Sequence, residues 1–287
     1  MKLAKYWSRQ TAPADLQGEP ITVGCWRGSM ESPEAAARLA KAAAQALAKR
    51  ITEQGGFVPD SGPARDYGYP DKALREELLE EFPDATGALA AAITRNAVGA
   101  RVLNTERAMF VDLDLGPLGL IDRIKAMFKL SPDTPEAAAL VKVATWLAAH
   151  PGWGFRVYRT PAGLRLLATH APQDPCAPET RRVLQDLHCD PLFIQLCGVQ
   201  ESFRARLDPK PFRVGLKTAP PPFPRTSLDA ERAFEAWLKD YRDRCEGRAA
   251  CAFLAHLGNT SVHPDLAKIV KLHDERSRAL ESGLRLG

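Results

Sequence analysis

Asp112 and Asp114 are the residues whose type and spacing point most directly to chemistry. They lie in the apolar run 109–115, and the side chains of a strand alternate between its two faces. A strand here places both carboxylates on one face, about 7 Å apart along the strand. Such carboxylates repel each other unless a positive charge, such as a divalent cation, lies between them. We therefore predict a site; the alternative is an exposed Asp pair at the end of an edge strand.

A second group of candidate residues is basic. Arg204 and Arg206 alternate with apolar residues, so a strand would place both guanidinium groups on one face, with Lys210 close behind. Residues 200–217 contain five basic side chains against two acidic ones. Because arginine binds phosphate oxygens through paired hydrogen bonds, we expect this segment to bind phosphate. The alternative is the solvated face of an edge strand.

A predicted hairpin carries further polar residues. Strand-like runs at 154–160 and 164–170 flank Pro161-Ala162-Gly163, a sequence typical of a turn. Arg165 lies just after this turn. One interpretation of Arg165 is a cross-strand pair with a carboxylate on the neighbouring strand.

The segments before and including the aspartates are predicted from caps, turn residues and apolar patterns. Residues 1–31 are expected to be irregular. A helix is expected from Ser32-Pro33 to Gly55-Gly56, followed by a loop over 57–70. A short charged helix is then expected from its cap Asp71 to the residue before Pro83. Three strands then form a meander with the aspartates on its last strand: 91–96, 100–103 and 109–115.

The segments beyond the aspartates are mostly helical, with the hairpin among them. Pro220-Pro221-Pro222-Phe223-Pro224 is expected to be a stiff connector. Helices are predicted at 118–128, 135–150, 178–187, 227–247, 248–257 and 264–283, with a further short helix after Asp190.

The composition excludes some classes of protein. With 45% hydrophobic and 26% charged residues among 287, usage is that of a globular chain. The sequence contains no run of about 18 apolar residues, so no membrane span is expected. Residues 1–9 do not resemble a signal peptide, and we therefore expect a cytoplasmic protein. The net charge of +4 permits a polyanionic partner without requiring one. Six cysteines lack a Cys-x-x-Cys pair and are expected to be free thiols.

With paired carboxylates, a polar hairpin and a basic strand, the chain resembles the archaeo-eukaryotic primase superfamily. That family has a palm-like α/β core with an Asp-x-Asp metal pair, a Ser-x-His-type nucleotide-binding motif on a hairpin, and a later Asp. The segment 110–114 (Phe-Val-Asp-Leu-Asp) matches the first motif, and 160–165 (Thr-Pro-Ala-Gly-Leu-Arg) lies where the second is expected. The resemblance covers residues 90–215. The chain is also similar to uncharacterised bacterial proteins with Thr-Arg-Asn, Asp-x-Asp and Phe-Arg-Ala-Arg-Leu segments, which implies no function.

The resemblance implies a divalent metal site. Asp112 and Asp114 would hold Mg²⁺ or Mn²⁺, and Asp190 would be the third catalytic carboxylate, with Asp208 as the next choice. Asp190 precedes a proline, so its alternative role is the N-cap of the following helix.

The resemblance also implies phosphate contacts. Arg165 stands where the family has a His that contacts the phosphates of the incoming nucleotide, and we expect Arg165 to act as a charged phosphate ligand. Thr160 would orient a phosphate through its hydroxyl. Arg204, Arg206 and Lys210 would bind the remaining phosphate charge.

The sequence thus predicts an α/β (α+β) fold with a palm-like mixed sheet, flanking helices and a C-terminal helical appendage. The expected segments are an N-terminal irregular and helical part (1–88), a palm-like core (89–217), and a Pro-rich connector with the helical appendage (218–287).

The expected function is metal-dependent nucleotidyl or phosphoryl transfer on nucleoside triphosphates or nucleic acid, by a primase-like DNA-binding enzyme. One alternative is a metal-dependent nuclease or phosphoesterase. Another, favoured by Arg165, is an inactive nucleic-acid-binding or adaptor protein. We expect no membrane partner, whereas the C-terminal helices could bind a protein partner.

Overall fold

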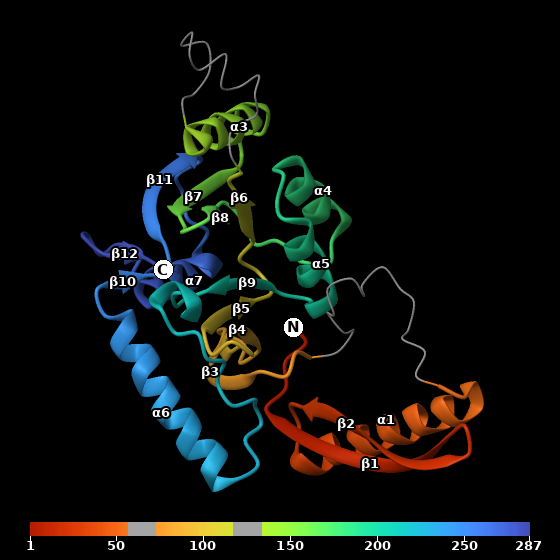
Figure 1. Cartoon of the computed structure of the whole chain (residues 1–287). Coiled ribbons are helices and arrows are strands. Elements are labelled where there is room, and N and C mark those ends of the chain that lie inside the picture. Colours follow the sequence, from red (N-terminus) through yellow and green to blue (C-terminus); the bar gives the residue numbers. More distant parts are fainter. Residues whose placement is uncertain (57–72, 117–133) are drawn as a thin grey trace.

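The strands that carry the candidate residues belong to two antiparallel sheets. The computed structural model of the chain describes residues 1–56, 73–116 and 134–287. The central sheet has the order β11-β7-β8-β6, and the second sheet has the order β3-β4-β5-β9 (Figure 1). Helices flank both sheets, so the fold is α+β, as the sequence predicts.

The central sheet contains the predicted hairpin and the predicted aspartate strand. Its strands are β6 (Phe110–Asp114), β7 (Gly154–Arg159), β8 (Gly163–Ala168) and β11 (Ala252–Gly258). β7 and β8 form the hairpin, and β6 pairs with β8 at the edge of the sheet.

The second sheet contains the predicted basic strand. Its strands are β3 (Glu77–Pro83), β4 (Leu89–Arg95), β5 (Arg101–Thr105) and β9 (Phe203–Arg206). The β4–β5 hairpin is confirmed, but the expected meander through β6 is wrong. β9 occupies the edge of β5, and the Thr105 hydroxyl accepts hydrogen bonds from the amides of Arg107 and Ala108, where the chain leaves this sheet.

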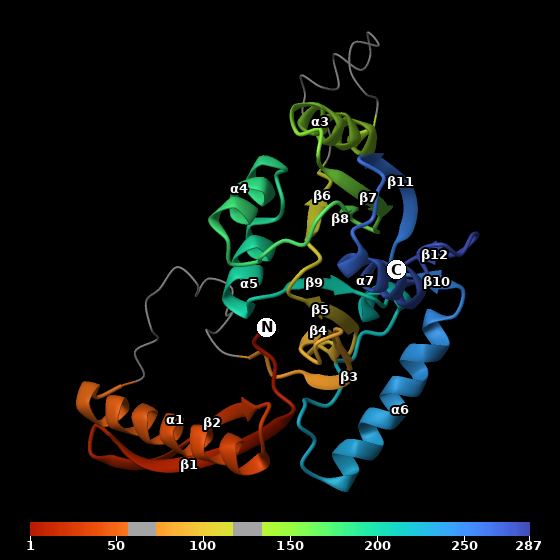
Figure 2. The same ribbon diagram turned by 180° about the vertical axis from the view of Figure 1, so that it is seen from behind.

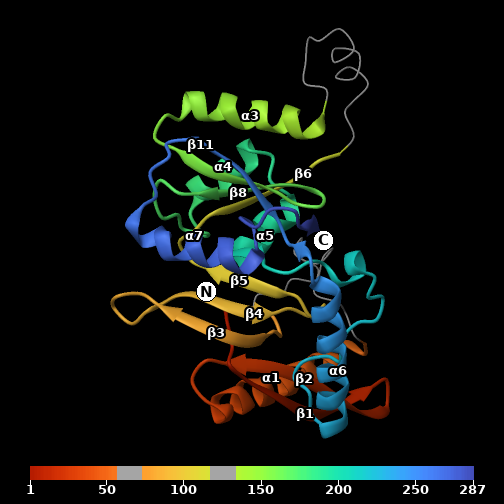
Figure 3. The ribbon, with the colours of Figure 1, turned by 90° about the vertical axis from the view of Figure 1, so that its left-hand side faces the viewer.

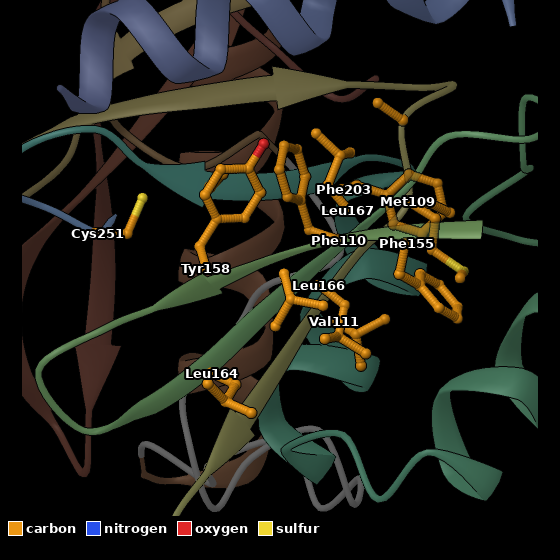
Figure 4. Close-up of a cluster of buried hydrophobic side chains, with 14 of the residues drawn as sticks. Met109, Phe110, Val111, Phe155, Tyr158, Leu164, Leu166, Leu167, Phe203 and Cys251 are labelled. Atoms are coloured by element: carbon orange, nitrogen blue, oxygen red, sulfur yellow. The ribbon is translucent and has the colours of Figure 1, made fainter. Parts of the chain in front are cut away.

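One hydrophobic core joins the two sheets. Val111 and Leu113 of β6 point into it, together with buried side chains of β7 and β8. Phe203 of β9 lies in the same cluster, as Figure 4 shows. Burial of β6 on its apolar face leaves Asp112 and Asp114 on the opposite face, as the alternation predicts.

Helices enclose the sheets. Besides α1 (Pro33–Gln54), they are α3 (Pro135–Ala149), α4 (Pro178–Asp186), α5 (Pro191–Gln200), α6 (Leu228–Cys245) and α7 (Pro264–Ser277). All five correspond to predicted helices. α3 lies beyond the central sheet, and α7 lies at the level between the two sheets (Figure 3). The expected helix at 118–128 and the expected loop at 57–70 fall outside the described residues.

Residues 1–31 form a hairpin, so the expected irregular segment is wrong. β1 (Tyr6–Leu16) and β2 (Glu19–Ser29) pair along their whole length, and α1 (Pro33–Gln54) packs on one face. This group lies at one end of the molecule (Figures 1 and 2). Gln17 and Gly18, both with positive φ, make the turn. Glutamine is not a usual residue there, which concealed the hairpin.

Two predicted helices are strands. The acidic segment 77–83 has helical propensity, but it pairs with β4 as β3, and Arg225 and Arg276 bind its Glu77 and Glu80. The segment 252–258 pairs with the open edge of β7 as β11. For β11 the partner strand β7 is distant in sequence, and for β3 the partner is the adjacent strand β4 together with the distant Arg225 and Arg276; in both cases these tertiary contacts outweigh local propensity.

The C-terminal residues are only partly an appendage. α6 forms a small cluster of its own with Val214 and Leu216, whereas α7 contributes Leu266 and Ile269 to the main core. β10 (Arg248–Ala249) and β12 (Arg285–Leu286) make a short parallel pair. Within the described residues, no helix has the length and apolarity needed to span a membrane.

Gly163 is required where β8 meets β6. A Cβ at this position would lie 1.9 Å from the backbone oxygen of Leu113. We expect Gly163→Ala to lower the free energy of unfolding by about 1–3 kcal/mol, the usual cost of overpacking, because β6 must move. Urea denaturation measures this change. Gly152→Ala is the control, since no atom lies within 4 Å of its Cβ position; an equal loss in both variants would contradict the account.

Candidate functional site

Asp112 is paired within the protein. On β6 it lies directly across from Arg165 of β8. The Arg165 Nε donates to Asp112 Oδ1 at 3.0 Å, and Arg165 Nη1 donates to the backbone oxygen of Arg206 at 3.0 Å. The Arg165 side chain is 6% exposed and the Asp112 side chain 35%. The cross-strand interpretation of Arg165 is therefore confirmed.

Asp112 stabilises the charge of the buried Arg165. Burial opposes the guanidinium charge, but the neighbouring Asp112 carboxylate, together with Cys251 and Tyr158, offsets burial and raises the pKa of Arg165 above its usual value. Arg165 in turn supplies the positive charge that the sequence analysis assigned to a metal ion. One Asp112 oxygen is thus already occupied by an arginine.

The other carboxylates do not complete a metal site. Asp114 is exposed at the end of the edge strand β6, as the alternative interpretation of the aspartates predicts. The Asp190 side chain caps α5 by accepting from the Leu192 amide, while its own amide donates to the Asp112 backbone oxygen. Asp208 is bound by Arg101 at 2.7 Å.

The donor set does not fit a resident three-carboxylate metal. Residues 1–56, 73–116 and 134–287 contain no group of three or more His, Cys, Asp or Glu side chains that could hold an ion. Asp190 approaches Asp112 through its backbone, so its helix-cap role is confirmed and its expected role as metal ligand lacks support.

Beside the aspartates lies a group of cations that we call the cationic cluster: Arg206, Lys210 and Arg213. Burial lowers the pKa of Lys210, and the charges of Arg206 and Arg213 lower it further, while Asp114 and Asp112 offset part of this effect. Burial likewise lowers the pKa of Arg206, with Arg165 adding to the effect. These side chains therefore share one electrostatic environment with the two aspartates.

The cationic cluster lacks neutralising partners in the described part of the chain. None of its three side chains forms an ion pair there, and Asp112 is already paired with Arg165. The buried Nε of Arg206 has no hydrogen-bond acceptor among the same residues. Unpartnered, partly desolvated cations favour the binding of an anion.

An exposed aromatic side chain adjoins the cationic cluster. Phe212 lies in the short 3₁₀ helix η2 (Pro211–Val214) and is 64% exposed. Lys210 Nζ lies 5.9 Å and Arg213 Cζ 5.6 Å from the centre of its ring. A solvent-facing ring close to two cations provides a surface on which a nucleobase can stack. Phe212 carried no signal in the sequence beyond its place in a basic segment.

The Arg204 side chain is bound by Glu76 and Asn104 and does not belong to the cationic cluster. Its Nη2 donates to Glu76 at 2.7 Å, and its Nη1 donates to Asn104 at 2.6 Å. Both Arg204 and Glu76 are over 90% buried. Arg204 thus holds β9 and β5 to the chain before β3. The interpretation of Arg204 as part of a solvated face is therefore wrong. Its two Nη atoms already donate to Asn104 and Glu76, which leaves the expected contact with phosphate without support.

Thr160 closes the hairpin turn. Its hydroxyl accepts from the Gly163 amide at 3.1 Å, and its amide donates to the Gly163 oxygen at 2.8 Å. The adjoining Ala162 oxygen accepts from the Leu115 amide just after β6. Thr160 therefore helps to position β8, and with it Arg165, against β6.

A buried polar network supports the other side of the hairpin. Tyr158 and Arg156 of β7 donate to Asp274 of α7, both at 2.6 Å. His273 contacts Asp274 on one side and Cys251 on the other, at 3.2 and 3.9 Å. Burial opposes ionisation of Asp274, but these donors outweigh it and lower its pKa. All six cysteines are free, as expected.

Comparison with known proteins adds no relative. No protein-family model, curated protein or solved structure matches the chain.

The Asp112–Arg165 pair should contribute to stability. We expect Asp112→Asn to lower the free energy of unfolding by about 1–3 kcal/mol, because it leaves the buried Arg165 without its anion. Asp114→Asn should change this free energy by less than about 0.5 kcal/mol, since Asp114 is exposed. Urea denaturation at neutral pH measures both. Equal effects of the two substitutions would show that the pair is not structural.

Proposed function

We propose that this protein binds phosphate groups of nucleotides or single-stranded nucleic acid at the cationic cluster and Phe212. The observation that carries the proposal is the excess of positive charge beside the aspartate strand. Arg206, Lys210 and Arg213 have no carboxylate partner in the described residues, whereas Asp112 is neutralised by Arg165. Such a surface matches the charge of a phosphate chain.

The geometry favours a single strand or a nucleotide over a duplex. Phe212 offers a ring for stacking, and a base can reach it only when it is unpaired. The two cations near the ring would contact the phosphates that flank the stacked base. This arrangement agrees with the resemblance to the archaeo-eukaryotic primase superfamily and with its inactive, nucleic-acid-binding alternative.

Metal-dependent nucleotidyl or phosphoryl transfer, or hydrolysis by a nuclease, is a second candidate. It is favoured by the placement of Asp114 and the second oxygen of Asp112 on the same face of β6, close enough to influence Lys210. A divalent ion would have to be held by these few oxygens and by the substrate's phosphates. Incorporation of labelled nucleotide into a primer, or cleavage of an oligonucleotide, would support this candidate.

Loss of two cluster charges should weaken binding and reduce its salt dependence. We expect Lys210→Ala/Arg213→Ala to bind a short labelled oligothymidylate at least tenfold more weakly, as measured by fluorescence anisotropy. The slope of log K against log salt should become shallower by about one to two, because two phosphate contacts are lost. The matched control is Arg38→Ala/Lys41→Ala, which removes two charges from exposed positions of α1.

Phe212→Ala separates stacking from charge. It should weaken oligothymidylate binding with little change in the salt slope, because it removes the ring and no charge. If the control variant loses as much affinity as Lys210→Ala/Arg213→Ala, binding depends only on net charge and the proposed site is wrong.

A further inference from the structure

We propose a second, separate binding site for a small organic phosphate, in an arginine-lined cavity between α6, β10 and the end of α7. The cavity has a volume of about 370 Å³. Its walls come from elements that meet beside the second sheet (Figure 1). None of the cationic cluster's side chains lines it, so it does not depend on the function proposed above.

Arginines dominate the charge of this cavity. Six line it, against three acidic residues: Arg95, Arg101, Arg242, Arg248, Arg276 and Arg278, with Asp208, Glu246 and Glu275. Four of the six have carboxylate partners, namely Asp208 for Arg101, Glu77 for Arg95, Glu80 for Arg276 and Glu281 for Arg278. These ion pairs hold the walls.

Arg242 and Arg248 are the cations available to a ligand. Neither side chain forms an ion pair with any residue that the structure describes, although Glu246 also lines the cavity. Arg242 is exposed on α6 and Arg248 is half-buried on β10, so they approach the cavity from two elements. Two guanidinium groups without an ion-pair partner, on the consecutive elements α6 and β10, match the several oxygens of one phosphate group.

Arg95 provides a buried donor in the same cavity. Its side chain is 9% exposed, and its Nη1 donates to the Gly99 backbone oxygen at 2.9 Å. Its Nε is buried without a hydrogen-bond acceptor among the described residues, and the nearest carboxylate oxygen, Glu77 Oε2, lies 3.4 Å away. Arg95 thus adds a buried positive charge to the cavity wall, and Glu77 offsets it only through a long contact.

The remaining wall suits the organic part of the ligand. Leu238 and Cys245 of α6 and Leu207 after β9 line the cavity beside the arginines. A cavity of this size, part apolar and part cationic, is typical of sites for small metabolites. A phosphorylated metabolite would place its phosphate toward Arg242 and Arg248 and its organic part against these side chains.

Calorimetry with inorganic pyrophosphate tests the phosphate part of this site. The background is the Lys210→Ala/Arg213→Ala protein, in which the cationic cluster does not contribute. There we expect one binding event, and adding Arg242→Ala/Arg248→Ala should weaken it at least tenfold. The matched control adds Arg232→Ala/Lys239→Ala instead, at exposed positions of α6 outside the cavity, and should change the affinity less than twofold.

The outcomes decide between the two sites. Unchanged binding after Arg242→Ala/Arg248→Ala, an equal loss in the control, or no binding at all would overturn the cavity proposal. If the cavity arginines matter but Lys210→Ala/Arg213→Ala leaves oligothymidylate binding intact, the cavity site stands and the cluster site fails. Circular dichroism checks that each variant is folded. If a double variant does not fold, the single substitution Arg242→Glu, at the more exposed position, replaces it and should abolish pyrophosphate binding.

Discussion

The ion pair between Arg165 and Asp112 is the interaction on which the arrangement of the site depends. It joins β8 to the edge strand β6, and Arg165 also donates to the backbone of Arg206 at the end of β9. One buried guanidinium therefore connects the central sheet to the second sheet at the point where the candidate residues meet. Because Arg165 keeps its charge at physiological pH, it supplies Asp112 with a fixed positive charge.

The same pair explains the electrostatics of the surface. An Asp-x-Asp strand without a counter-charge would attract a divalent ion, but here Arg165 takes one carboxylate oxygen and Asp190 is occupied as a helix cap. The neighbouring Arg206, Lys210 and Arg213 are then left in excess over the acids. The Asp-x-Asp pattern that predicts a metal site from the sequence is, in the folded chain, part of a surface that favours anions.

Local patterns in the sequence predict the parts of the fold that local forces determine. The alternation around Asp112, the Pro-Ala-Gly turn and the capping serine and threonine residues gave the strand, the hairpin and most helices their correct places. The sequence did not reveal β11 because its partner strand β7 is distant, nor β3 because its glutamates favour a helix locally and are bound by the distant Arg225 and Arg276. Likewise, Arg204 meets Glu76 at a separation of 128 residues, a contact that no local pattern reveals. For Arg165 the sequence allowed either a cross-strand ion pair or a phosphate ligand, and only the fold shows that it pairs with Asp112.

The most direct test of the central claim is the affinity for oligothymidylate with Mg²⁺ and with EDTA, at equal ionic strength. If Arg165 replaces the metal's charge, the two affinities should agree within about twofold, since phosphate binding then depends on the fixed cations. Binding that is more than tenfold tighter with Mg²⁺, and that loses this gain in Asp114→Asn, would show that the aspartates hold a metal and would contradict the account.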